Sequence, residues 1–106
     1  MPDRRPPLDL IYLRSRIAPI TVLMWFGWRP TRHEPRAIRG PCPIHGSTSR
    51  RSRSLAVTLT VVYCHVCHWR GDALALYQHY RCLPLLEAAY ELSERCGVET
   101  RPLRRG

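Results

Sequence analysis

Two pairs of metal-binding residues constrain this chain more than any other feature. Cys42 and His45 form the first pair, Cys64 and Cys67 form the second, and two residues separate the members of each pair. Ligands at this spacing can reach one ion from a tight turn, and structural zinc takes four nitrogen or sulfur ligands in a tetrahedron. The 18 residues from 46 to 63 are enough for a loop and strands that bring the two turns together. The pattern predicts one structural zinc ion in a zinc ribbon.

Two spare histidines, His65 and His68, lie within and directly after the second pair. Once four ligands fill the tetrahedron no position is left for them, and we expect both to be solvated turn residues or phosphate contacts. A closed site also argues against zinc catalysis, which keeps a position open for water. The paired spacing makes the alternative, that Cys42 and Cys64 are simply small buried hydrophobes, the weaker interpretation.

The size of the chain makes such a metal site important for stability. Its 106 residues fit one domain, and folding alone would bury only roughly 60 to 70% of the surface of the unfolded chain. A structural zinc ion contributes on the order of 10 to 16 kcal/mol, whereas a whole domain is stable by about 5 to 15 kcal/mol. We therefore expect the middle of the chain to unfold without zinc.

The charge of the chain favours a polyanionic partner. The net charge is +9, and all 17 basic residues are arginine. The planar guanidinium group binds two phosphate oxygens at once and also stacks on bases, although a codon bias would give the same composition. Residues 36 to 70 contain arginines and no acidic residue. Nucleic acid, rather than a membrane surface, is therefore expected to contact the middle of the chain.

The cysteine usage and hydropathy indicate a cytoplasmic protein. The five cysteines are an odd number, and the paired spacing points to metal rather than to disulfide bonds. We expect Cys82 and Cys96 to be core or partly buried thiols in helices. The most apolar run, residues 20 to 28, is nine residues long, whereas a membrane span needs about 20. No signal peptide is expected from the N-terminal sequence.

The N-terminal half is predicted to be helical before an extended connector. Leu10, Leu13 and Ile17 have helical spacing, and Pro19 should stop or bend that helix. A second short helix is expected over residues 20 to 26, with Gly27 at its C-cap. The arginine- and proline-rich stretch that follows should run extended to the first metal-binding pair.

The second half is predicted to contain strands and two helices. Residues 54 to 63 alternate and are rich in β-branched side chains, which predicts strand. Whether they form one strand or a hairpin stays open, because no Gly, Asn or Asp marks a turn. Asp72 is placed to cap the next helix, Pro84 should be the first residue of the last helix, and Gly97 should close it.

The last helix is predicted to be amphipathic. Its acidic residues, Glu87, Glu91 and Glu94, should face water, and its apolar face should comprise Leu85, Ala89, Leu92 and Cys96.

Together these motifs resemble the zinc-binding domain of bacterial DnaG-type DNA primases. The resemblance rests on CPIH (residues 42 to 45), YCHVC (63 to 67), GDALALY (71 to 77) and LLEAAYELSERCGV (85 to 98). It implies a small α+β fold, a zinc ribbon with an antiparallel sheet flanked by short helices. The domain would cover residues 8 to 98, between a flexible basic tail (1 to 7) and a basic C-terminal tail (99 to 106).

The same resemblance implies that the chain binds single-stranded template DNA in primer synthesis. In such primases a separate catalytic domain holds magnesium with a glutamate and clustered aspartates. Here the aspartates, Asp3, Asp9 and Asp72, lie far apart in the sequence, so no catalytic residue is predicted. Whether the chain counts as an enzyme therefore depends on a catalytic primase or polymerase protein as its partner. A replicative helicase is a further candidate partner.

The aromatic residues that the family often carries near the first cysteine are replaced here by Ile38, Arg39 and Ile44. Trp69 is our predicted base-stacking platform instead, because stacking on a base needs no particular sequence. The alternatives are that Trp69 packs against the sheet and that the arginines form a solvated face. Trp25, Phe26 and Trp28 are expected in the core. The predicted nucleic-acid contacts are Arg39, Arg50, Arg51, Arg53, Trp69 and Arg70.

Two other functions fit the sequence less well. A zinc-stabilised regulator of a mobile element or replicon would bind duplex DNA, but no recognition helix with base-reading side chains is visible. A protein-docking accessory would use zinc only for stability and would meet its partner through the acidic last helix or residues 25 to 28.

Overall fold

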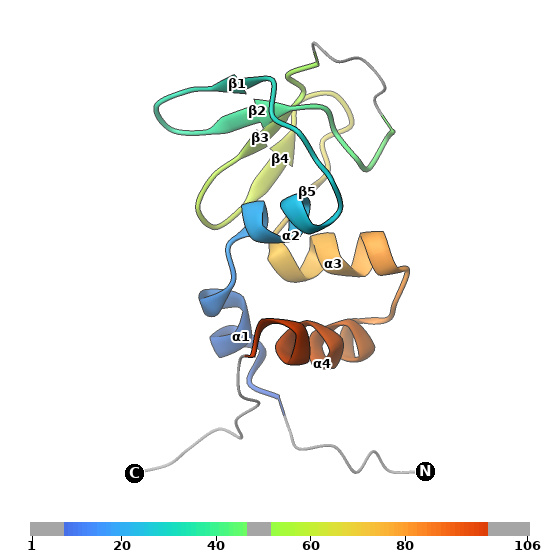
Figure 1. Cartoon of the computed structure of the whole chain (residues 1–106). Coiled ribbons are helices and arrows are strands. Elements are labelled where there is room, and N and C mark those ends of the chain that lie inside the picture. Colours follow the sequence, from blue (N-terminus) through green and yellow to red (C-terminus); the bar gives the residue numbers. More distant parts are fainter. Residues whose placement is uncertain (1–7, 47–51, 98–106) are drawn as a thin grey trace.

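The structure, a computed structural model, describes residues 8–46 and 52–97. Five antiparallel strands form one sheet in the order of the sequence, and the four helices lie on one side of it, with α2 and α3 nearest to the strands (Figure 1). This arrangement confirms the predicted small α+β fold. The elements are α1 (Leu10–Arg16), α2 (Pro19–Trp25), β1 (Arg32–His33), β2 (Ile38–Gly40), β3 (Leu55–Val57), β4 (Val62–Cys64), β5 (Arg70–Gly71), α3 (Ala73–Arg81) and α4 (Leu85–Cys96).

Some predictions fall outside the described residues. They include both tails, and the arginines Arg50 and Arg51 in the loop between the two metal-binding turns. The division into one domain and two tails therefore stays a prediction. No helix of the described part is long and apolar enough to cross a membrane.

The two N-terminal helices form close to their predicted positions. The Asp9 side chain caps α1 by accepting a hydrogen bond from the Tyr12 amide (3.0 Å). α1 ends at Arg16, before Pro19, as predicted. Pro19 is itself the first residue of α2, because an amide is not needed in the first helical turn. Consequently α2 starts and ends one residue earlier than predicted, and Gly27 follows its C-cap with a φ of +80°.

The stretch from residue 54 to residue 63 is a hairpin of β3 and β4. Its turn contains Thr58 instead of the glycine, asparagine or aspartate that usually marks such a turn. The Thr58 amide donates to the Val61 carbonyl (2.9 Å), and the Thr58 hydroxyl accepts a hydrogen bond from the Val61 amide (3.1 Å). The side chain thus satisfies the turn's backbone groups, which resolves the question that the sequence left open.

The strand register gives the sheet two different faces. One face packs on the helices and carries Ile38, Gly40, Leu55, Val57, Val62 and Cys64. Because successive side chains of a strand alternate, the paired residues between these rows point the other way. That row, which we call the open face, comprises Arg32, Arg39, Ala56, Tyr63 and Arg70. The described helices all lie on the opposite side of the sheet (Figure 1).

The ends of α3 and α4 follow simple capping rules. Asp72 caps α3, as predicted, by accepting a hydrogen bond from the Ala75 amide (3.0 Å). Pro84 occupies the N-cap of α4 and not its first helical position, so that prediction was one residue off. Gly97 closes α4 with a φ of +68°, as predicted.

One of the three acidic residues predicted to face water instead joins the last two helices. Glu91 accepts hydrogen bonds from Arg81 Nε (2.6 Å) and from the hydroxyl of buried Tyr77. Hydrogen bonds from Arg81 and Tyr77 lower the pKa of Glu91 to about 2. Glu87 and Glu94 are exposed, as predicted. The acidic face of α4 is therefore narrower than the helical spacing indicates.

Trp28 connects the helices to the first metal-binding turn. It is buried, and its Nε1 donates a hydrogen bond to the carbonyl of Pro41 (2.6 Å), the residue before Cys42. Its ring also lies directly on Gly40, where a Cβ would be 2.3 Å from the Trp28 ring. The predicted core position is confirmed for Trp28, while Trp25 and Phe26 are partly buried against the core.

This contact predicts the effect of adding one methyl group. Gly40→Ala should destabilise the metal-loaded protein by about 1 to 3 kcal/mol, because Trp28 must move away from both Gly40 and Pro41. Urea unfolding followed by circular dichroism measures the loss. A Trp28→Leu background serves as the control, since it gives the methyl group room. An equal loss in both backgrounds would show that the ring contact is not the cause.

Candidate metal centre

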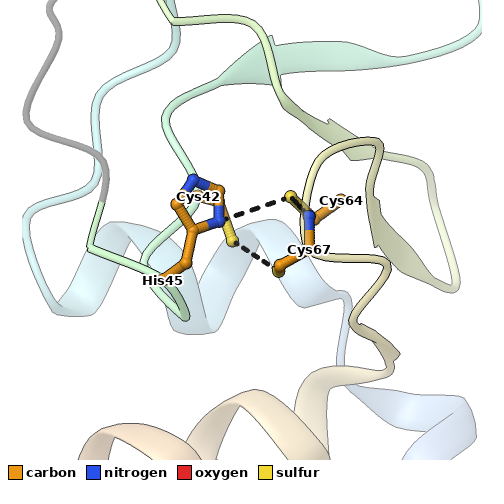
Figure 2. A group of neighbouring side chains, drawn as sticks. All are labelled: Cys42, His45, Cys64 and Cys67. Carbon is orange, nitrogen blue, oxygen red and sulfur yellow. Dashed lines mark hydrogen bonds between the residues drawn. The ribbon is translucent and has the colours of Figure 1, made fainter.

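The four predicted ligands converge on one point between the two turns (Figure 2). Their ligand atoms all lie within 4.8 Å of one another. Cys42 Sγ is 3.9 Å from Cys67 Sγ, and Cys64 Sγ is 3.6 Å from His45 Nδ1. A tetrahedral zinc ion with ordinary bond lengths separates two sulfurs by about 3.8 Å and a sulfur from a nitrogen by about 3.6 Å. The residues therefore fit a single tetrahedral ion.

The first turn delivers Cys42 and His45 from the end of β2. Cys42 is buried, whereas His45 is exposed. The turn starts at Pro41, whose carbonyl is held by Trp28, and reverses at Gly46, which has a φ of +70°. A buried indole thus holds the start of the turn that carries the first two ligands.

The second turn delivers Cys64 and Cys67 from the end of β4. Cys64 Sγ accepts hydrogen bonds from the amides of Val66 and Cys67 (both 3.3 Å). The Cys64 carbonyl accepts another from the His68 amide (2.9 Å). The backbone thus wraps around one sulfur and offers it two amide donors, which favour its thiolate form.

The electrostatics of the thiols favour a cation between them. Burial opposes ionisation of Cys64, but hydrogen bonds from the amides of Cys67 and Val66 outweigh it and lower the Cys64 pKa to about 6. Burial and the neighbouring Cys64 raise the pKa of Cys42 to about 11. One thiolate therefore forms readily and opposes the second. A divalent cation removes that opposition, because metal ligation requires the thiolate forms.

The remaining cysteines take no part in this group. Cys96 is partly buried, as predicted, and burial raises its pKa. Cys82 was expected in or near the core but is exposed, because it caps α3 in the left-handed conformation with a φ of 55°. Neither forms a disulfide bond.

The predicted nucleic-acid contacts occupy different places on the sheet. Arg70 is exposed on the open face, and Arg53 is exposed at the approach to β3. Arg39 also lies on the open face, but its guanidinium group is engaged by the Arg53 carbonyl (2.5 Å) and by Glu34 (3.5 Å). It therefore has fewer donors to offer to a phosphate.

Trp69 lies on the helix side of the sheet, opposite Arg70. Its ring covers Gly71, where a Cβ would be 2.6 Å away, and it packs against the core while remaining partly exposed. This is the packing alternative that the sequence left open. A role of Trp69 as a stacking platform stays a prediction.

The open face instead presents Tyr63, which the sequence reasoning missed. Tyr63 is half-buried on β4 and pairs with Arg70 on one side and Ala56 on the other. A signal for it existed, because Cys64 must point toward the metal and strand alternation then turns Tyr63 outward. His65 and His68, exposed beside it, lie outside the four-ligand group.

Comparison with solved structures identifies a bacterial primase of similar fold. The crystal structure of the Aquifex aeolicus primase, comprising zinc-binding and RNA polymerase domains, matches with a TM-score of 0.69 and 26% sequence identity. The match covers 87% of this chain and 22% of that chain, so this chain spans less than a quarter of that protein. It confirms the resemblance to a primase zinc-binding domain. No family model and no curated protein sequence matches the chain.

The geometry predicts one divalent ion per chain. Cys67→Ser should weaken metal affinity by about 100-fold, since one of four ligands carries roughly 3 kcal/mol of the binding free energy. Competition with a chromogenic chelator measures the affinity. His65→Ala is the matched control, because it changes a residue of the same turn outside the ligand group. A metal affinity that falls as far in the control would contradict this assignment.

Proposed function

We propose that the chain is the zinc-binding module of a DNA primase and holds single-stranded template DNA on the open face of its sheet. One observation carries the proposal: the strand that supplies Cys64 to the metal centre also presents Tyr63 beside Arg70 on that face. A metal-stabilised strand end thus displays an aromatic ring and a guanidinium group together. These are the two groups that bind single strands without regard to sequence.

Zinc is the ion that we assign to the site. Three thiolates and one imidazole in a tetrahedron suit zinc better than the oxygen-preferring cations magnesium and calcium. Its role here is structural, because four protein ligands leave no position for water or substrate.

Phosphate binding is assigned to the arginines around the open face. Arg70 and Arg53 are exposed and lead this group, Arg39 contributes more weakly because Glu34 engages it, and Arg50 and Arg51 are retained from the sequence. Tyr63, with Trp69 as a second candidate, would stack on the bases. One stacked base is worth about 1 to 3 kcal/mol.

The joining of ribonucleotides is assigned to a separate catalytic protein. The primase of known structure carries an RNA polymerase domain in addition to its zinc-binding domain, and this chain spans 22% of that protein. A replicative helicase remains a further candidate partner, and the cytoplasm is the expected location.

The structure offers less support for a regulator that binds duplex DNA. Reading the major groove requires a helix with an exposed face of base-reading side chains. The longest described helix, α4, exposes Glu87 and Glu94, which repel phosphate, and its buried residues pack in the core.

Salt dependence tests the proposed DNA contacts. If three to five arginines each neutralise one phosphate, the log-log slope of affinity against salt should be about −2 to −3.5 for a single strand. Arg70→Gln should reduce the magnitude of that slope by about 0.7. Fluorescence anisotropy with a labelled oligonucleotide measures both.

Arg16→Gln is the control, since this exposed arginine belongs to α1 among the helices (Figure 1). It should leave the slope unchanged. Tighter binding to a duplex than to a single strand of the same length would argue for the regulator instead.

A further inference from the structure

His68 adopts a backbone conformation that ordinarily favours glycine. Its φ is 64°, and among the described non-glycine residues only Cys82 shares a positive φ. It directly follows the metal ligand Cys67, and its amide completes the turn by donating to the Cys64 carbonyl. Glycine would adopt this backbone conformation with less strain, yet the position carries an imidazole side chain.

This conformation brings the His68 ring to Tyr63. His68 Nδ1 and the Tyr63 hydroxyl oxygen share a hydrogen bond of 3.0 Å. His65, from the same turn, meets the Tyr63 ring edge to face, with centroids 4.9 Å apart and an interplanar angle of 81°. Two histidines that do not belong to the ligand group therefore contact one tyrosine, His68 at its hydroxyl and His65 at its ring.

We propose that His68, supported by His65, is a positioning residue that fixes the Tyr63 ring on the open face for stacking on a template base. The inference rests on the proposed function. A tyrosine ring that is anchored only at its Cα can rotate about two torsions, and ordering it on binding weakens affinity. The hydrogen bond at the far end of the ring removes that freedom beforehand, and it offsets strain at His68. Because Cys64 and Cys67 shape the turn, metal binding and the orientation of Tyr63 are coupled.

Two oligonucleotides separate stacking from phosphate contact. One is a thymidine oligonucleotide, and the other has the same length but consists of abasic sites, so that it keeps the phosphates and offers no base. On the thymidine strand, Tyr63→Ala should bind about 5- to 150-fold more weakly than the unmodified chain. Tyr63→Phe and His68→Gly should each lose about 2- to 10-fold, since each removes the same hydrogen bond. Glycine is chosen at position 68 because it accepts the positive φ without strain.

The double variant and the abasic strand make the test specific. Tyr63→Phe combined with His68→Gly should lose no more than either change alone, because both remove one interaction. On the abasic strand all variants should bind like the unmodified chain. His68→Asn, which tolerates a positive φ and can still hydrogen-bond, should recover affinity relative to His68→Gly. If His68→Gly loses its metal, Tyr63→Phe carries the test, because it removes the same hydrogen bond from the other partner. His79→Ala changes an exposed histidine of α3 and should have no effect.

The outcomes distinguish this inference from the function on which it rests. If the unmodified chain binds neither strand, the proposed function itself fails. If Tyr63→Ala weakens binding to the thymidine strand while His68→Gly and Tyr63→Phe do not, the function stands and the positioning role is overturned. Losses that add up in the double variant, or that are equally large on the abasic strand, also overturn it, since they indicate a direct phosphate contact or a damaged fold.

Discussion

The convergence of two cysteine-containing turns on one point is the constraint on which the rest of the structure depends. The strands of this sheet are only two or three residues long, and strands this short are not stable by pairing alone. An ion held by both turns would join the end of β2 to the end of β4. It would thereby fix β3, which lies between these two strands in the sheet. A bound ion would thus supply the stability that a sheet of this size cannot generate from its own core.

The two faces of the sheet carry different side chains where β4 meets the second turn. At residues 63 and 64, strand alternation sends a metal ligand toward the helices and an aromatic ring toward the open face. Trp28 then connects the helices to the first turn through Gly40 and the Pro41 carbonyl. The surface that we assign to DNA therefore lies directly beside the four-ligand group.

Features governed by short-range rules were predictable from the sequence, whereas those that depend on the register were not. The four ligands, the Asp72 cap and the Gly97 cap follow from spacing and residue type within a few positions. The hairpin turn was left open because Thr58 supplies through its hydroxyl what glycine supplies through its backbone. Tyr63 lies beside Arg70 only because β4 pairs with β5. Glu91 likewise meets Arg81 only because α3 and α4 pack together. For the same reason Trp69, next to Arg70 in sequence, lies on the other side of the sheet.

The order of the strands has a consequence for how the molecule assembles. Each strand pairs only with its neighbour in the sequence, so no strand has to wait for a distant partner. Topologies dominated by such local contacts fold rapidly, because little loop-closure entropy is lost before contacts form. Within the sheet, the longest closure joins β2 to β3 and brings the two ligand turns together. The two ligands of one turn could bind an ion first, and the ligands of the other turn could then complete the site. In that order the metal would help to nucleate folding as well as stabilise the folded state.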